Sequence, residues 1–260
     1  MGTARQETQG LNLPMSDPQA RIAELEAELA AVRREMQEFT SAVSHDLRAP
    51  LRHIVSFAQL VEEDAGPQLS AEVQGFLATI AGSAQHLGVM LDGLRELARI
   101  GALPLAPEPV TLPALVHEVA AELAHAHGPR QLALEVDVPD TAAVVDATLL
   151  RVVLRAVLDN AWKFTSRLPE AQARVGVCAQ LSAGRWTLVV QDNGAGFAAT
   201  HPEQALRIFG RLHTASTFPG LGVGLALAAK AAQRMGGVLQ LAPAQPVGCV
   251  VTLSWPQAER

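Results

Sequence analysis

The chain has 260 residues, a formal net charge of -6 at pH 7, and 49% hydrophobic residues. This length can bury one large core or two smaller ones, and the acidic balance without a long Lys/Arg run argues against binding to nucleic acid or an anionic membrane surface. No stretch reaches the ~18 to 20 apolar residues of a membrane span, and the N-terminus lacks a signal-peptide pattern. Two cysteines without metal-ligand spacing favour a reduced, cytoplasmic protein.

The N-terminal region predicts a flexible lead-in followed by a long helix. Residues 1–18 are polar and contain Pro14 and Pro18. Beyond them, apolar residues recur at alternating spacings of three and four, the a/d rhythm of a coiled coil: Ile22, Leu25, Leu29, Val32, Met36, Phe39 and Val43. This helix is predicted to run to about Asp64, where the sequence Ala65-Gly66-Pro67 ends it.

A second helix is predicted to begin after Ser70, which is a suitable N-cap residue. It carries one apolar stripe: Val73, Leu77, Ile80, Ala84, Leu87, Leu91 and Leu94. The two amphipathic helices form a hairpin over residues 19–101, and a single hairpin cannot cover both stripes. The pattern therefore predicts a homodimer in which two hairpins make a four-helix bundle.

The rest of the chain predicts a second domain over residues 111–260, reached through a proline-rich linker over residues 102–110. Helix-like segments are expected over residues 112–126, 147–163 and 222–235. Strand-like segments are expected over residues 131–138, 174–181, 185–191 and 247–255. The fold class is α+β, with helices layered on one face of a mixed sheet.

The first sequence that indicates chemistry is Ser44-His45-Asp46-Leu47-Arg48-Ala49-Pro50-Leu51, on the coiled-coil helix. A neutral imidazole is a nucleophile at physiological pH, and an adjacent carboxylate can orient the ring. Pro50 predicts a bend beside this site. Taken alone, a His-Asp pair on a helix is more often a solvated surface pair.

Three further sequences indicate a nucleotide site, although each also allows a structural interpretation. Asn160 offers an oxygen ligand for Mg²⁺, and Lys163, nearly one turn later, can reach a phosphate; an ordinary helix end is the alternative. Asp192, at a strand end, can accept a hydrogen bond from an adenine amino group, with Gly194 and Gly196 allowing close approach of the backbone; an ordinary Asn-Gly turn is the alternative.

The third of these sequences contains Gly220, Gly222 and Gly224, at the start of a helix, where backbone N–H groups can bind phosphate. A dinucleotide-binding loop of the Rossmann type is the competing interpretation. It requires a preceding strand and a small residue where Leu225 stands, and residues 198–219 instead predict a loop. We therefore do not favour it.

The four sequences, in this order, resemble those of the sensor histidine kinases, over nearly everything from residue 36 to 255. The segment from His45 to Leu51 resembles the H box, and Asn160–Lys163, Asp192–Gly196 and Gly220–Gly224 resemble the N, G1 and G2 boxes. Phe209-Gly210-Arg211-Leu212-His213 is similar to the F box of phytochrome-like kinases.

The resemblance implies a hairpin dimer followed by an ATP-binding sandwich of the Bergerat type. It implies that His45 is phosphorylated from ATP with Asp46 as orienting base, and that the phosphoryl group passes to an aspartate of a response regulator. Asn160 would hold Mg²⁺, Asp192 would bind adenine, and the phosphates would be enclosed by Lys163, the lid over residues 198–219 and the second glycine sequence. Arg211 is a further candidate for phosphate contact. The signal would come from a sensor that is on a separate protein or that is missing from this chain.

Three positions depart from the pattern of the family. Ala156 stands where many members have a second asparagine that helps to hold the metal. Ala49 stands where a Thr or Asn often supports dephosphorylation of the regulator, which predicts weak or absent phosphatase activity. Leu221 replaces a common Thr. Two other classes of protein stay open: a clamp-type ATPase without phosphohistidine, and a degenerate kinase that acts as a dimeric scaffold.

Overall fold

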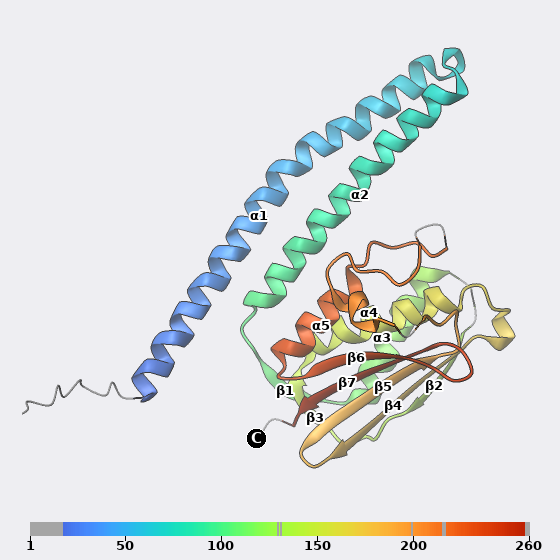
Figure 1. The fold of residues 1–260 in the computed structure, drawn as a ribbon. Helices are drawn as coiled ribbons and strands as arrows, with labels where there is room; N and C mark the ends of the chain where they lie inside the picture. Colours follow the sequence, from blue (N-terminus) through green and yellow to red (C-terminus); the bar gives the residue numbers. More distant parts are fainter. Residues whose placement is uncertain (1–17, 129, 131, 199, 215–216, 258–260) are drawn as a thin grey trace, which may run out of the picture.

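The computed structural model describes residues 18–257 apart from 129, 131, 199, 215 and 216, and Figure 1 shows a long helical hairpin beside an α/β domain. Of the lead-in predicted over residues 1–18, only Pro18 lies within the described residues, and it begins the first helix. Within the described part of the chain, every helix is too short or too polar to cross a membrane.

The hairpin consists of α1 (Pro18–Ala65) and α2 (Ala71–Ala102), joined by the short 3₁₀ turn η1 (Gly66–Gln68). Ser70 is the N-cap of α2, because its side chain accepts a hydrogen bond from the backbone N–H of Val73 at 3.4 Å. Both the helix break and the cap are confirmed. Helix α1 continues through Pro50 and curves along its length (Figure 1).

Most of the apolar stripe of the hairpin is exposed in the single chain. Phe57 is 66% exposed and Phe76 is 58% exposed. The other large exposed apolar residues of the two helices include Ile22, Leu25, Leu29, Val32, Met36, Phe39, Ile54, Leu60, Val61, Val73, Ile80 and Leu87. Packing of α1 against α2 therefore leaves a long apolar face without a cover.

The second domain is a five-stranded sheet in the order β2-β4-β5-β7-β6, with three helices on one face (Figure 1). The central strands β4 (Arg174–Ser182), β5 (Arg185–Asp192) and β7 (Cys249–Pro256) are antiparallel, β6 (Val238–Pro243) is antiparallel to β7, and only β2 (Ala133–Asp137) runs parallel to its neighbour β4. The helices are α3 (Leu112–His127), α4 (Ala147–Thr165) and α5 (Gly224–Arg234). The predicted α+β class is confirmed.

Alternation along β5 shows how the sheet builds the core. Trp186, Leu188 and Val190 are buried against the helices, whereas the residues between them are partly exposed on the other face. Trp186 also stacks on Trp255 of β7, with ring centroids 6.1 Å apart. One face of the sheet therefore carries the core of the domain.

Three strands were not anticipated from the sequence. β1 (Pro107–Val110) pairs antiparallel with β3 (Ala143–Asp146), so the last four residues of the predicted linker 102–110 form part of a sheet. Its two prolines cannot donate ladder hydrogen bonds, and such residues are tolerated in a short strand at an edge. β6 also lay outside the predicted strands. Two further 3₁₀ turns are η2 (Glu170–Gln172) and η3 (Pro202–Leu206).

The C-terminal half of α2 packs against the second domain. Ile100 is fully buried in the core of that domain. The Arg234 guanidinium, at the end of α5, donates hydrogen bonds to the carbonyl groups of Gly101 and Leu103. These contacts place α5 along α2 (Figure 1).

Candidate nucleotide-binding site

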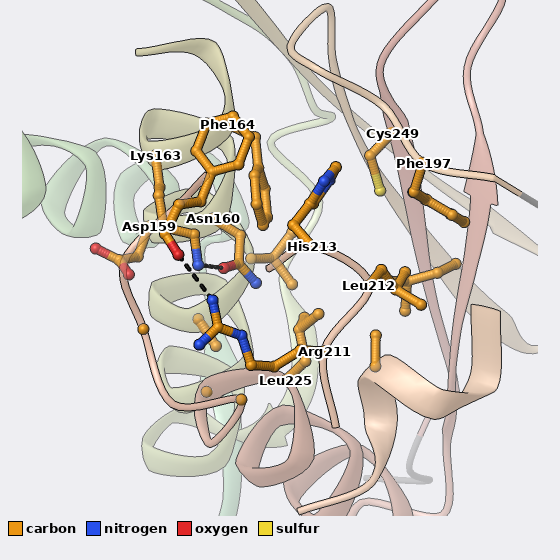
Figure 2. A pocket seen from close by; sticks show the side chains of 18 of the residues that line it. Asp159, Asn160, Lys163, Phe164, Phe197, Arg211, Leu212, His213, Leu225 and Cys249 are labelled. Atoms are coloured by element: carbon orange, nitrogen blue, oxygen red, sulfur yellow. Dashed lines mark hydrogen bonds between the residues drawn. The ribbon is translucent and has the colours of Figure 1, made fainter. Parts of the chain in front are cut away.

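A cavity of about 340 Å³ lies between the C-terminal half of α4, the end of β5 and the segment that leads into α5. This volume is within the usual range for small-molecule sites. Figure 2 shows side chains from these elements around one space. The predicted site residues that line it are Asn160, Lys163, Asp192, Gly196, Arg211, Gly220, Gly222 and Gly224.

Helix α4 presents the first group of polar side chains. Its N-cap is Asp146, whose carboxylate accepts a hydrogen bond from the backbone N–H of Leu149 at 3.0 Å. Near its other end, the Lys163 ammonium donates to Asn160 Oδ1 at 2.9 Å (Figure 2). Burial lowers the pKa of Lys163, and the charge of Asp159 opposes this shift. A cation and an amide oxygen therefore face the cavity together.

Asp192, at the end of β5, is the most deeply buried carboxylate of the cavity, with 6% of its surface exposed. Burial raises its pKa to about 6, although hydrogen bonds from the backbone N–H groups of Gly194 and Cys249 act in the opposite direction. The Gly194 N–H donates to Asp192 Oδ1 at 2.9 Å. The carboxylate is thus fixed in an apolar setting, where it can accept a hydrogen bond from a ligand amino group.

The glycines after Asp192 have different roles. Gly196 lines the cavity and has a φ of 61°, which favours glycine. Gly194 instead packs against α4, because a Cβ there would lie 2.6 Å from the carbonyl oxygen of Phe164. Gly196 can therefore allow a ligand to approach the backbone closely. Gly194 lies outside the cavity lining and allows the end of β5 to pack against α4.

The described part of the segment 198–219 is held over the cavity. The backbone N–H of Phe209 donates to the carbonyl of Gly222 at 2.9 Å. The rings of Phe164, His213 and Phe218 form a cluster with centroids 5.0 to 5.2 Å apart. The Arg211 guanidinium donates to the Phe218 carbonyl at 2.8 Å (Figure 2). The predicted lid thus contacts the second glycine sequence, through Gly222, and helix α4, through Phe164.

His45 and Asp46 lie on α1, outside the cavity lining. His45 Nδ1 is 3.2 Å from an Asp46 carboxylate oxygen, and the side chains are 84% and 81% exposed. The neighbouring Ser44 is buried, and its hydroxyl donates to the carbonyl of Leu91 on α2 at 3.3 Å. His45 is therefore an accessible imidazole at the level of residue 91 of α2.

The cavity also touches α2 at this level. Val89 of α2 lines the cavity, which the sequence did not predict. Two residues beyond Leu91, Gly93 lies so close to Val223 that an added Cβ would be 2.8 Å from its Cγ1 atom. The cavity and Ser44, the residue before His45, thus contact the same short stretch of α2.

Further cavity residues were absent from the predicted site. Two of them are Asp159, next to Asn160, and Cys249 on the opposite side of the cavity (Figure 2). Burial raises the pKa of the Cys249 thiol to about 12, so it stays a protonated, apolar neighbour of Asp192. Asp159 stood beside a predicted site residue, but only the fold shows that it accepts a hydrogen bond from His127.

The oxygen chemistry of the cavity fits a hard divalent cation such as Mg²⁺, which prefers oxygen ligands and keeps several waters. Asn160 Oδ1 is a suitable oxygen in the cavity, although Lys163 now donates to it. Ala156, one turn earlier on α4, also lines the cavity and offers only a methyl group.

Comparison with known proteins identifies both halves of the chain. The family model for the His Kinase A (phospho-acceptor) domain matches residues 35–103, and the model for histidine kinase-, DNA gyrase B- and HSP90-like ATPases matches residues 145–259. Together they cover more than half of the chain. The second match shows that the α/β domain is an ATP-binding domain.

Individual proteins agree with this result. The chain is 28% identical over 232 residues to cyanobacterial phytochrome B of Nostoc sp., covering 83% of this chain and 29% of that protein. It is also 28% identical over 239 residues to the methanogenesis regulatory histidine kinase FilI of Methanothrix harundinacea, covering 92% of this chain and 26% of that protein. The chain therefore spans less than a third of the length of these relatives.

A solved structure gives the same answer. The crystal structure of full-length ShkA in complex with AMPPNP has a TM-score of 0.60 and 28% sequence identity, and the match covers 86% of this chain and 47% of that one. Its agreement with the two family models extends over the hairpin and the ATP-binding domain alike. The chain belongs to the two-component sensor histidine kinases, as the core that joins a phospho-acceptor hairpin to an ATP-binding domain.

Proposed function

We propose that this chain phosphorylates itself on His45 from ATP and passes the phosphoryl group to an aspartate of a response regulator. The observation that carries this proposal is that one short stretch of α2 contacts both sites. Leu91 contacts Ser44, the residue before His45. Val89 lines the cavity, and Gly93 packs against Val223 in the second glycine sequence. A nucleotide in the cavity would thus lie beside the part of the hairpin that holds the acceptor.

The chemistry follows from the His45–Asp46 pair. With Asp46 accepting the Nδ1–H, the lone pair of Nε2 is free to attack the γ-phosphorus. The new N–P bond forms as the bond from phosphorus to the β–γ bridging oxygen breaks, and ADP leaves with that oxygen. The Nδ1 proton then moves to Asp46, which leaves an uncharged imidazole ring that carries the anionic phosphoryl group on Nε2.

Within the ATP-binding domain, we assign the adenine amino group to Asp192 and Gly196, and the phosphates to Lys163, Arg211 and the second glycine sequence (Gly220, Gly222 and Gly224). Asn160 Oδ1 would hold Mg²⁺, which neutralises phosphate charge when it is bound. Because Lys163 donates to that same oxygen in this structure, it must release Asn160 and turn toward the phosphates. Positioning and charge neutralisation would supply most of the catalysis.

Transfer also requires relative movement of the two domains, because His45 is outside the cavity lining. Residues 103–106 join α2 to β1 without regular secondary structure, and they are the natural place for this movement. The proposed partners are a second copy of the chain on the apolar face of the hairpin, the receiver domain of a response regulator, and a separate sensor protein. We propose a cytoplasmic location, in keeping with two free thiols.

The test is incubation with γ-labelled ATP and Mg²⁺, comparing wild type with His45→Ala and His53→Ala. His53 is an exposed histidine two turns further along α1 and serves as the matched control. We expect an acid-labile, alkali-stable label that only His45→Ala removes, with nucleotide binding intact in all three proteins. A label that persists in His45→Ala would overturn the assignment. ATP hydrolysis without any label would favour the clamp-type ATPase, and binding without turnover would favour the scaffold.

A further inference from the structure

Asp159 is a cavity residue to which the proposed function gives no role. It precedes Asn160 on α4, and both residues line the cavity. Ala156, which lies one turn before Asn160 on the same helix face, contributes no polar atom. A neutral amide oxygen alone is a weak anchor for a divalent cation, because oxygen sites for Mg²⁺ commonly include a carboxylate. The nearest side chain in sequence that carries negative charge at this end of the cavity is Asp159.

The Asp159 carboxylate is held in place from another helix. His127, the last residue of α3, places Nε2 2.8 Å from Asp159 Oδ1. The His127 ring also stacks on the buried Trp162, with centroids 6.3 Å apart and planes inclined by 16°. Arg130 donates to the Trp162 carbonyl at 3.0 Å, which fixes the same end of α4. The carboxylate is therefore oriented by a supported imidazole, and its Oδ2 atom has no partner among the described residues.

The Lys163 ammonium is a positive charge that already lies beside Asn160 in this part of the cavity. The Lys163 ammonium donates to Asn160 Oδ1 at 2.9 Å, and Lys163 lies four residues after Asp159, on the adjacent turn of α4. One positive charge in this part of the cavity thus binds the amide oxygen and lies next to the turn that carries the carboxylate. When Lys163 turns toward phosphate, that position is open to another cation.

We propose that Asp159 is the second protein group of the Mg²⁺ site, which binds the ion through a coordinated water, and that His127 is a positioning residue for its carboxylate. The inference rests on the proposed function. The carboxylate supplies charge that the amide of Asn160 lacks and compensates for the missing polar group at Ala156. A hydrogen-bonded carboxylate of this kind is a common feature of the outer shell of metal sites.

The experiment is calorimetric titration of ADP into the full chain at a series of Mg²⁺ concentrations. Asp159→Asn should raise the Mg²⁺ concentration for half-maximal enhancement of ADP binding about 10- to 100-fold, the usual effect of an outer-shell change. Its affinity for ADP without Mg²⁺ should be equal or higher, because a negative charge near the phosphates is removed. Unchanged Mg²⁺ dependence would overturn the proposal.

Two His127 variants separate positioning from packing. His127→Phe keeps a ring on Trp162 but removes the hydrogen bond to Asp159, and it should shift the Mg²⁺ dependence in the same direction as Asp159→Asn. His127→Gln keeps a donor and should retain nearly wild-type dependence. Equal behaviour of the two variants would refute the positioning role, and thermal unfolding of each protein checks that the domain is intact.

Ala156→Asn tests the compensation directly. It places an amide one turn before Asn160, so the loss caused by Asp159→Asn should be smaller in this background than in the wild type. An undiminished loss would overturn the compensation. Failure of the wild type to bind ADP at all would instead refute the proposed function, so the two failures are distinguishable.

Discussion

The hairpin and the ATP-binding domain differ in how much of their apolar surface is buried within one chain. Helix α1 has 48 residues and buries only Ser44 and Ala58, whereas α4 has 19 residues and buries nine. The domain completes its core within one chain, by packing three helices on one face of a sheet. The hairpin leaves its apolar stripe exposed. Folding of the domain should therefore be independent of a partner, while the hairpin should depend on a second copy.

The largest expected effect is loss of this second copy. Phe57→Ser combined with Phe76→Ser removes two of the most exposed aromatic side chains of the hairpin. Each phenylalanine contributes about 1.5–3 kcal/mol when buried, and a symmetric dimer loses four of them. We expect a dimer to become a monomer in analytical ultracentrifugation, while ADP binding by the domain persists.

The control for this prediction is Leu181→Ser, which changes an exposed apolar residue of the sheet in the ATP-binding domain. This variant should stay dimeric. A double phenylalanine variant that is still a dimer at micromolar concentration would show that the hairpin faces do not form the dimer contact.

Packing inside the domain should be less tolerant than the surface of the hairpin. Gly194→Ala places a Cβ 2.6 Å from backbone atoms of Phe164, so either α4 or the end of β5 must move. Overpacking of this kind costs about 1–3 kcal/mol, and the melting temperature should fall. Gly176→Ala, on β4 with no atom within 4 Å of the added Cβ, should leave the melting temperature unchanged or slightly higher. Equal melting temperatures of the two variants would contradict the packing role.

The hairpin was the part of the fold most open to prediction from sequence. Its periodicity is local, and Ser70, Gly66 and Pro67 mark the turn with residues whose preferences depend on neighbouring backbone alone. The strands β1 and β3 were missed because each has four residues, β1 contains two prolines, and each is stabilised by pairing with a partner more than 30 residues away. Such pairing leaves no periodic signal.

The candidate site divides in the same way. Asn160, Lys163 and Asp192 stood in recognisable sequences, and the fold gathers them in one cavity. Contacts between distant segments could not be derived: the His127–Asp159 hydrogen bond joins two helices, and Val89 comes from the other domain. The role of Gly194 was also hidden, since glycine is equally suited to approach a ligand or a helix end.

The variant Asp192→Asn tests a second difference between the two regions. Asp192 is a buried carboxylate, and burial makes its charged form less stable. Its pKa of about 6 lies above the ordinary value of 3.8, so between these pH values the folded state binds more protons than the unfolded state. Folding stability from this group is thus lost as pH rises through the window, and ionisation costs about 3 kcal/mol at neutral pH. Asp192→Asn should raise the melting temperature at pH 7.5 and have little effect at pH 4. A lower melting temperature at pH 7.5 would refute this account.

The same variant should bind ADP about 10- to 100-fold more weakly, because the adenine amino group loses a charged acceptor worth about 1.5–3 kcal/mol. In the wild type, ADP affinity should fall as the pH drops below about 6 and Asp192 becomes protonated. Since the ADP phosphate also titrates, the relevant quantity is the difference between wild type and Asp192→Asn in calorimetric titrations from pH 5 to 8. A constant difference across this range would exclude Asp192 as the titrating acceptor.

The smallest expected effect concerns the exposed chemistry of the hairpin. Ala49 lies one turn after His45 on α1 and is partly exposed, so a hydroxyl there can orient a water near the imidazole without changing the core. We expect little dephosphorylation of a cognate phospho-regulator by wild type and a gain of a few fold for Ala49→Thr, measured as loss of label from the regulator. The control is Ala49→Val. Valine has the branched shape of threonine without its hydroxyl, and both residues have a helix propensity roughly 0.5 kcal/mol less favourable than that of alanine. The valine variant should resemble wild type. Robust activity in wild type, or an equal gain in Ala49→Val, would show that a hydroxyl at this position is not what the hairpin lacks.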